Sequence, residues 1–300
     1  MHAGGPIRAA RQPRGRAPAA AKRGSLVVVG TGMKLVAHTT LEALACIESA
    51  EQLFYLVDEP ATEAWLRRLN PTATSLEGYY AVGKPREKTY RDIANRLVSA
   101  VRSGQQVCAA FYGHPGVFVD PSHAAVRRLR REGFAARMLP GISSEDCLFA
   151  DLHLDPGARG CQSFEASDFL ACRRRFDPTS PLVLWQVGAL GEPGYRPEMS
   201  SRTERLEVLT AFLRAHYPAR HPIVLYEAAN FPTCEPVVRR IPLSRLPRTT
   251  VFTLVTILVP PLPDRVDDPK IMRWFDESEG AAPNAPARTA ATRNGSRARR

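Results

Sequence analysis

Residues 107–121 read VCAAFYGHPGVFVDP and predict a buried strand that runs through a turn into a helix. Residues 107–111 form a short apolar run, typical of a strand covered on both faces. In the turn 112–118, two glycines and a proline surround His114, which lets backbone amides approach a ligand closely. Asp120 and Pro121 are predicted as the N-cap and first residue of a helix over 121–131.

The same strand-and-helix pattern recurs on both sides of this stretch. Apolar runs at 26–29, 53–57 and 135–139 predict further buried strands. Helical spacing of apolar residues appears at 38–50, 62–69 and 90–102, and another helix is expected to open at Ser143, capped with Asp146. Alternating strands and helices predict an α/β fold with a parallel, doubly wound sheet.

The sequence changes character after residue 163. Predicted strands at 182–185, 223–226 and 251–259 surround an amphipathic helix at 202–216, and prolines cluster between them. We therefore expect a first α/β domain over 25–163 and a second over 164–262. Residues 263–300 are expected to hold a short helix near 270–275 and a basic tail.

The charge distribution disfavours nucleic acid as a partner. The net charge is +11, but residues 1–24 hold six bases and no acid and residues 281–300 hold five bases and no acid. The body between them is neutral, and we expect both tails to be solvated and disordered because they contain almost no large apolar residues.

Other protein classes are disfavoured too. No apolar run approaches the roughly 20 residues that cross a bilayer, and no secretory signal is recognisable, so a cytoplasmic protein is expected. The six cysteines have no metal-site spacing; we interpret most of them as buried, reduced thiols and expect no metal.

Three turns at the ends of predicted strands are candidate ligand sites, because open α/β sheets bind ligands at their carboxyl edge. The first contains Gly30 and Gly32; a dinucleotide fingerprint would need a third glycine where Leu35 stands, which disfavours NAD. His114 has a plain alternative as a turn residue, and Ser143 has one as a helix cap.

Together these turns resemble the S-adenosylmethionine-binding turns of the tetrapyrrole methylase superfamily, the class III methyltransferases. In porphyrin methylases and diphthine synthase the middle turn usually has Asp where this chain has His114. The form YGHPGVF instead resembles borosin peptide α-N-methyltransferases. Further matches are QSFEAS at 162–167, LWQ at 184–186 and YEAAN at 226–230. The resemblance covers about residues 25–261.

The resemblance implies a fold of two α/β domains with S-adenosylmethionine in the cleft between them, since interdomain clefts are common ligand sites. The residues that it places at this cofactor are Gly30, Gly32, Tyr112, His114, Gly116, Val117, Phe118, Ser143, Ser144, Gln186, Ala228 and Thr256.

The resemblance also implies catalytic roles for Tyr80, Arg86, Tyr90 and Tyr112. A backbone amide nitrogen is a poor nucleophile because its lone pair is delocalised. We assign Tyr90 as the base with Arg86 favouring its anion, Tyr80 to orienting the amide, and Tyr112 to the donor–acceptor interface. On local grounds, Tyr90 could simply begin a helix, Arg86 could belong to a basic stretch, and Tyr112 could end a strand. Glu77 stands where some borosin enzymes have another tyrosine.

Many borosin enzymes are fused to their own apolar core peptide, whereas residues 281–300 contain no Val, Ile, Leu or Phe. We therefore expect a split enzyme that acts as a homodimer, in a 2:2 complex, on a separately encoded precursor peptide. Two alternatives stay open: a methylase of a tetrapyrrole or other small molecule, and a non-catalytic RNA-binding or scaffold protein on this fold.

Overall fold

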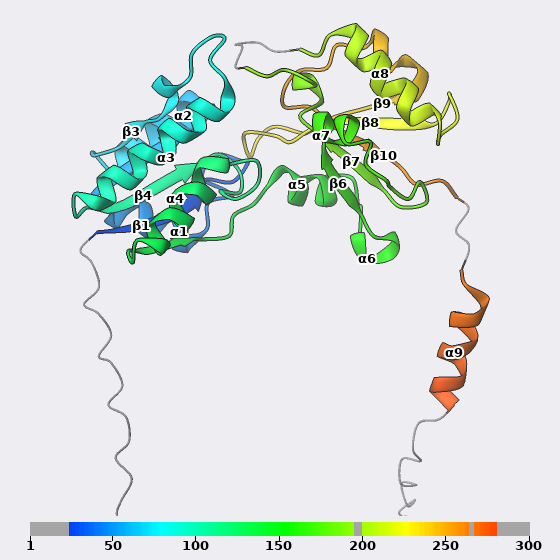
Figure 1. Ribbon diagram of the computed structural model, residues 1–300, viewed down its shortest axis with the longest axis horizontal. Helices are drawn as coiled ribbons and strands as arrows, with labels where there is room; N and C mark the ends of the chain where they lie inside the picture. The colour runs from blue at the N-terminus through cyan, green and yellow to red at the C-terminus, as the bar shows by residue number, and fades with distance from the viewer. Residues whose placement is uncertain (1–23, 195–199, 264–266, 281–300) are drawn as a thin grey trace, which may run out of the picture. The chain divides into compact units, whose positions relative to one another are not determined.

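The computed structural model describes residues 24–194, 200–263 and 267–280, and it divides after Pro261 into two units (Figure 1). The first unit contains two β-sheets. In the second unit the described helix is α9, Pro269–Gly280, which includes the helix expected at 270–275. The predicted basic tails lie outside the described residues, apart from Gly24.

The first sheet is entirely parallel. Its strands, in spatial order, are β3 Thr74–Ser75, β2 Gln52–Leu56, β4 Gln106–Phe111, β1 Ser25–Gly30 and β5 Ala135–Met138. The helices between them are α1 Leu41–Ser49, α2 Pro60–Leu69, α3 Arg86–Arg102 and α4 Asp120–Arg131, and the 3-10 turn η1 is Glu77–Tyr79.

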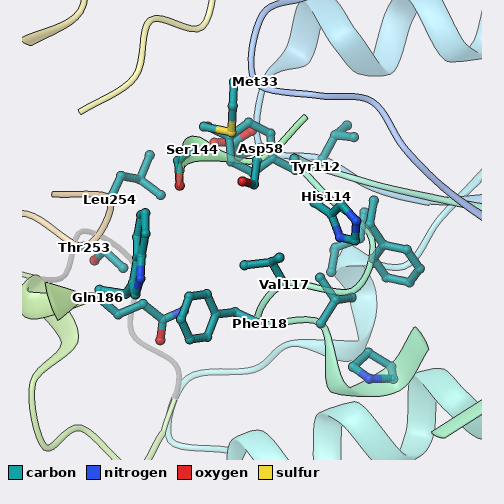
Figure 2. Close-up of a pocket in the computed structure, with 18 of the residues that line it drawn as sticks. Met33, Asp58, Tyr112, His114, Val117, Phe118, Ser144, Gln186, Thr253 and Leu254 are labelled. Carbon is teal, nitrogen blue, oxygen red and sulfur yellow. The ribbon is translucent and has the colours of Figure 1, made fainter. Parts of the chain in front are cut away.

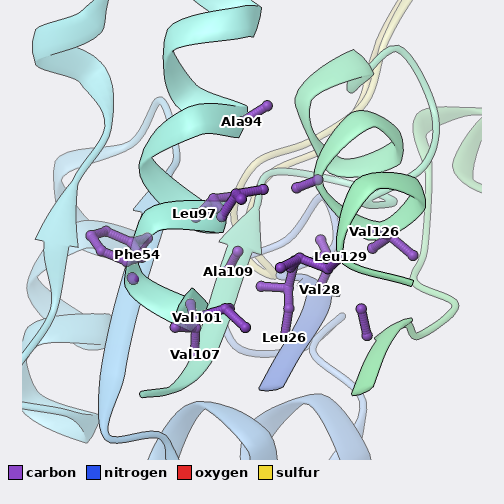
Figure 3. Packing of buried hydrophobic residues seen from close by; sticks show 14 of the residues in the cluster. Leu26, Val28, Phe54, Ala94, Leu97, Val101, Val107, Ala109, Val126 and Leu129 are labelled. Atoms are coloured by element: carbon purple, nitrogen blue, oxygen red, sulfur yellow. The ribbon is translucent and has the colours of Figure 1, made fainter. Parts of the chain in front are cut away.

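Helices cover both faces of this sheet, which confirms the doubly wound prediction. Leu26 and Val28 of β1 pack in one buried cluster with Leu97 of α3 and Leu129 of α4 (Figure 3). Val29, the next residue along β1, belongs to a separate cluster that includes residues of α1 and α2. Alternate side chains of one strand thus enter two different cores, as expected for a strand buried on both faces.

The strand order creates a topological switch point between β1 and β4. These neighbours lie side by side, but the chain leaves β1 toward β2 and leaves β4 in the opposite direction, toward β5. Connections that diverge in this way open a crevice at the carboxyl ends of the two strands. The first and middle candidate turns both lie there.

The second sheet is mixed. Its order is β6 Gln162–Glu165, β7 Leu182–Trp185, β10 Thr256–Val259, β8 Pro222–Glu227 and β9 Val237–Pro242, and only the β6–β7 pair is parallel. The other elements are α5 Ser144–Asp151, α6 Pro156–Arg159, α7 Ala166–Ala171, α8 Thr203–Arg214, η2 Val187–Ala189 and η3 Leu243–Arg248. β6 begins before the predicted boundary at residue 164.

Several elements differ from the sequence prediction, and β3, β6, α6 and α7 are absent from it. The strand expected over 251–259 contains only β10, because Phe252 and Leu254 are exposed and the chain turns at Val255, whose amide donates to the Phe252 carbonyl. Strand β9 was missed, since it is an exposed edge strand with no apolar alternation. Helix α3 begins at Arg86 after Pro85, one turn earlier than expected.

Two further details are corrected. Asp120 is the first residue of α4 and not its N-cap, which is Val119 without a side-chain hydrogen bond. The Asp120 carboxylate lies in the first turn of α4, where it interacts favourably with the partial positive charge of the helix N-terminus. The cysteines are free, but Cys172 and Cys234 are exposed, because Cys172 lies at the surface end of α7 and Cys234 in a loop.

The buried cluster under α4 makes a quantitative prediction. Leu129 is fully buried, so Leu129→Ala should lower the free energy of unfolding by about 2–5 kcal/mol through lost burial and the cavity left behind. The control is Leu41→Ala, which makes the same chemical change at a leucine that is 85% exposed and should change stability by about 0.5 kcal/mol or less. Urea unfolding curves measure both, and equal effects would contradict the assigned core.

Candidate active site

A pocket of about 420 Å³ opens at the carboxyl edge of the first sheet and is walled by both sheets of the first unit (Figure 2). Its volume lies in the usual range for small-molecule sites. Ten predicted site residues line it: Tyr80, Tyr90, Tyr112, His114, Val117, Phe118, Ser143, Ser144, Gln186 and Thr256. The fold therefore gathers segments from five separate parts of the chain around one cavity.

The predicted glycines are not among the lining residues; they hold the turns together instead. A Cβ on Gly30 would collide with the Gly113 carbonyl and with Pro115, and one on Gly141 would lie 3.3 Å from the same carbonyl oxygen. Gly32 and Gly113 exchange backbone hydrogen bonds of 3.2 and 3.1 Å. The three turns are thus packed backbone against backbone, which side chains would prevent.

Hydrogen bonds to two histidines, His114 and His123, hold the middle turn in shape. The Gly116 amide donates to His114 Nδ1 at 3.0 Å, and the Val117 amide donates to the His114 carbonyl at 3.2 Å. His123 Nε2 lies 2.8 Å from the Gly116 carbonyl oxygen. His114 therefore shapes the turn, as the plain interpretation holds, and it also lines the pocket; its role in ligand binding stays a prediction.

Two lining residues, Phe118 and Gln186, have left-handed backbone conformations, with φ of 55° and 56°. Such conformations cost about 1–3 kcal/mol in residues other than glycine and cluster at functional sites. The Phe118 ring lies 6.1 Å from that of Trp185, centroid to centroid, so the first-sheet turn contacts the end of β7. Figure 2 shows Phe118 and Gln186 close together on one wall.

Ser143 forms the predicted capping box of α5. Its amide and hydroxyl donate to Asp146 Oδ2 at 2.7 and 2.8 Å, while its oxygen accepts from the Asp146 amide at 3.3 Å. The Ser143 hydroxyl is therefore already used in hydrogen bonds within the capping box. The neighbouring Ser144 begins the helix and also lines the pocket. The cap interpretation is therefore correct, and it places two serines at the pocket wall.

Asp58 is a lining residue that the sequence reasoning missed. It lies two residues after the end of β2, at the carboxyl edge of the sheet, and this position was the available signal. Desolvation, with added repulsion from Glu59 and Glu227, raises the pKa of Asp58 to about 6. Glu77 also lines the pocket, so a carboxylate stands where some borosin enzymes have tyrosine.

Two of the pocket phenols, Tyr112 and Tyr90, have raised pKa values. Burial raises the pKa of Tyr112 strongly, and the charges of Asp58 and Glu227 add to the effect. Burial also raises the pKa of Tyr90; Arg86, four residues earlier on α3, opposes that shift and Asp120 supports it. Arg86 favours the Tyr90 anion as expected, but its charge is outweighed by desolvation. Arg86 itself is not a lining residue, and neither is Ala228, which is buried beside the pocket with Met33 and Trp185.

Asn230 connects the pocket to three turns of the first sheet. The Tyr112 hydroxyl donates to Asn230 Oδ1 at 3.3 Å, and Asn230 Nδ2 donates to Glu59 Oε1 at 2.9 Å. The Asn230 carbonyl also accepts from the Leu35 amide at 2.9 Å. These hydrogen bonds therefore attach the loop after β8, which belongs to the second sheet, to the turns of the first sheet beside the pocket.

A second pocket of about 390 Å³ lies between α3 and α4 and shares Tyr90 and Pro121 with the first. Among the described residues, no group of three or more His, Cys, Asp or Glu side chains is placed to hold a metal ion. No helix in the described part of the chain has the length and apolar character needed to cross a bilayer.

The fold is that of the class III methyltransferases. The chain belongs to the tetrapyrrole (corrin/porphyrin) methylase family, whose model matches residues 25–246. A solved structure of the same fold is uroporphyrin-III-C-methyltransferase from Thermus thermophilus, with a TM-score of 0.57, 24% identity, and coverage of 79% of this chain and 92% of that one.

Curated relatives within this family confirm the borosin resemblance. The chain is 42% identical over 84% of its length to the methyltransferase/precursor of the ribosomally synthesized cyclic gymnopeptides from Gymnopus fusipes, covering 61% of that protein. It is 40% identical over 80% of its length to a methyltransferase/type I borosin cyclic peptide precursor from Coprinopsis marcescibilis, covering 63%. The chain thus spans about three fifths of the length of these relatives.

The raised pKa of Asp58 predicts a pH-dependent stability effect. Because the folded state holds the proton more tightly than the unfolded state, stability from this group is present below about pH 4 and is lost as the pH rises through about 6. Asp58→Asn should therefore raise the free energy of unfolding more at pH 8 than at pH 4. The difference between the two effects should be about 1 kcal/mol after allowing for screening by solvent. Urea unfolding at both pH values measures the difference, and an effect independent of pH would contradict the shift.

Proposed function

We propose that the chain is an S-adenosylmethionine-dependent methyltransferase that methylates backbone amide nitrogens of a peptide. The observation that carries this proposal is the grouping of Tyr80, Tyr90 and Tyr112 around one pocket with the His114 turn. The names of the curated relatives, which combine a methyltransferase with a cyclic peptide precursor, support a peptide substrate.

The residues present fit a cationic methyl donor. When bound, S-adenosylmethionine supplies an electrophilic methyl group on a positively charged sulfur. The pocket offers the carboxylates of Asp58 and Glu77 and the rings of Phe118 and Trp185, which favour a cation. Ser144 and the His114 turn would hold its polar groups, and the tightly packed glycine turns keep their side of the cavity clear.

The phenols would act on the amide. We assign Tyr90 to removing the amide proton and Tyr80 to orienting the carbonyl, because an amide nitrogen attacks only when its lone pair is released from resonance. Since burial keeps Tyr90 protonated at neutral pH, the transfer rate should rise with pH. Arg86 contributes by reducing the cost of forming the Tyr90 anion.

We propose that the peptide is a separate molecule and that the enzyme is a homodimer in the cytoplasm. Mass spectrometry of the purified chain incubated with donor tests the first point. The dimer rests on the borosin resemblance, and light scattering of the purified chain tests it. The division into domains 25–163 and 164–262 likewise stays a prediction.

Donor binding should depend on the middle turn. His114→Ala removes the acceptor of the Gly116 amide, and Gly116→Val forces a side chain toward Met138 and His123. Each should weaken the Kd for S-adenosylmethionine about tenfold or more, the equivalent of ~1.4 kcal/mol. Calorimetry measures this, with His221→Ala as a histidine control whose ring contacts the Pro260 carbonyl outside the pocket. Unchanged affinity in both variants would place the donor elsewhere.

Chemistry should depend on Tyr90. Tyr90→Phe should slow single-turnover methyl transfer by about 10²- to 10⁴-fold while the donor still binds, the usual contribution of a positioned base. Arg86→Lys should be slower than wild type but faster than Arg86→Ala, because lysine keeps the charge without the planar fork. The matched control is Tyr217→Phe, which removes a buried hydroxyl with no partner among the described residues. A normal single-turnover rate in Tyr90→Phe would show that Tyr90 is not the base.

The substrate prediction is tested by mass spectrometry. Incubating the purified chain with donor should leave its own mass unchanged, whereas an apolar peptide encoded beside it should gain one methylene per transfer on backbone nitrogen. Fragmentation locates each added group. Methylation of the chain itself would refute a separate substrate, and methylation only of a tetrapyrrole would refute a peptide substrate.

A further inference from the structure

Asn230 and Glu59 form a chain of hydrogen bonds that ends on the Tyr112 hydroxyl. Asn230 lies in the loop after β8, and Glu59 is the N-cap residue of α2. The distances are 2.9 Å from Asn230 Nδ2 to Glu59 Oε1 and 3.3 Å from the Tyr112 hydroxyl to Asn230 Oδ1. Neither Asn230 nor Glu59 lines the pocket.

The chemistry of these groups fixes the direction of every bond. An ionised carboxylate only accepts hydrogen bonds, so Glu59 must face the amide nitrogen of Asn230. The amide oxygen is then turned toward Tyr112 and also only accepts. The shared proton must therefore come from Tyr112. The orientation of the Asn230 amide thus follows from the Glu59 carboxylate, which can only accept.

We propose that Glu59 and Asn230 are positioning residues that commit the Tyr112 proton to Asn230, so that the Tyr112 oxygen meets the pocket only as an acceptor. A neutral phenol has one proton to donate, and here it is used outside the cavity. The oxygen keeps lone pairs for a polarised C–H or N–H group.

This orientation divides the roles of the tyrosines, and in that respect it rests on the proposed function. A hydroxyl that must donate to Asn230 cannot also donate to a developing amide oxyanion. Donation to that oxyanion therefore falls to Tyr80, and Tyr112 is left to accept.

The decisive variant is Glu59→Gln, which keeps the size of the side chain but can donate as well as accept. Asn230 is then free to rotate its amide and donate to Tyr112, and a negative charge near the phenol is lost. Both changes favour the Tyr112 anion. Asn230→Asp acts in the opposite direction, because a carboxylate beside the phenol disfavours its anion.

The readout is 19F NMR of protein containing 3-fluorotyrosine, whose fluorine brings phenol titration into an accessible pH range. Tyr112→Phe identifies the Tyr112 resonance. We expect Glu59→Gln to lower the Tyr112 titration midpoint by about one unit or more and Asn230→Asp to raise it. The control is Glu63→Gln, an acid on the same helix that pairs with Arg67 and should leave the midpoint unchanged.

The measurement needs neither donor nor peptide, so it can fail or succeed apart from the proposed function. Midpoints in Glu59→Gln and Asn230→Asp that match Glu63→Gln would overturn the proposal. A Glu59→Gln shift larger than that of Glu227→Gln, which removes another carboxylate that raises the Tyr112 pKa, would establish it, even if Tyr112→Phe later proved to transfer methyl groups at the normal rate.

Discussion

The site depends on three turns whose backbones touch. Gly30 ends β1, and Gly113 and Gly141 lie in the turns that follow β4 and β5. A Cβ on Gly30 would collide with the Gly113 carbonyl, and one on Gly141 would lie 3.3 Å from its oxygen. This contact is possible only without side chains, and it occurs at the switch point, where diverging connections leave a crevice. With the three turns packed together, the residues that follow each of them must face one cavity: His114 after the second turn and Ser144 after the third.

Burial then decides the electrostatics of that cavity. Removing Tyr90 and Tyr112 from water disfavours their anions. Arg86 offsets only part of this cost at Tyr90, whereas nearby carboxylates add to it at Tyr112, so both phenols hold their protons. Desolvation likewise raises the pKa of the Asp58 carboxyl to about 6. The pocket therefore combines phenols that keep their protons with a carboxyl group whose charge is costly.

The second sheet completes the site through irregular segments more than through its strands. Gly188 lies against the backbone of Phe252 and Thr253, and this close approach turns Thr253 and Leu254 to the pocket. Gln186 accepts a strained left-handed conformation at the end of β7. Asn230 ties the loop after β8 to the first sheet. Backbone strain and hydrogen bonds between segments of the two sheets thus position four side chains at the site, and none of the four belongs to a strand.

The sequence by itself determined the parallel doubly wound sheet, the capping box at Ser143 and the family, because these depend on local periodicity and on short motifs. Most of the predicted pocket residues also followed from motifs at strand ends. Only the tertiary structure decided that Asp58 lines the pocket, that Thr253 and Leu254 line it instead of extending a strand, and that Asn230 connects Glu59 to Tyr112. The physical reason is range: hydrogen bonds between residues far apart in the chain, and the loss of water around a carboxyl or phenol, depend on neighbours that no local pattern records.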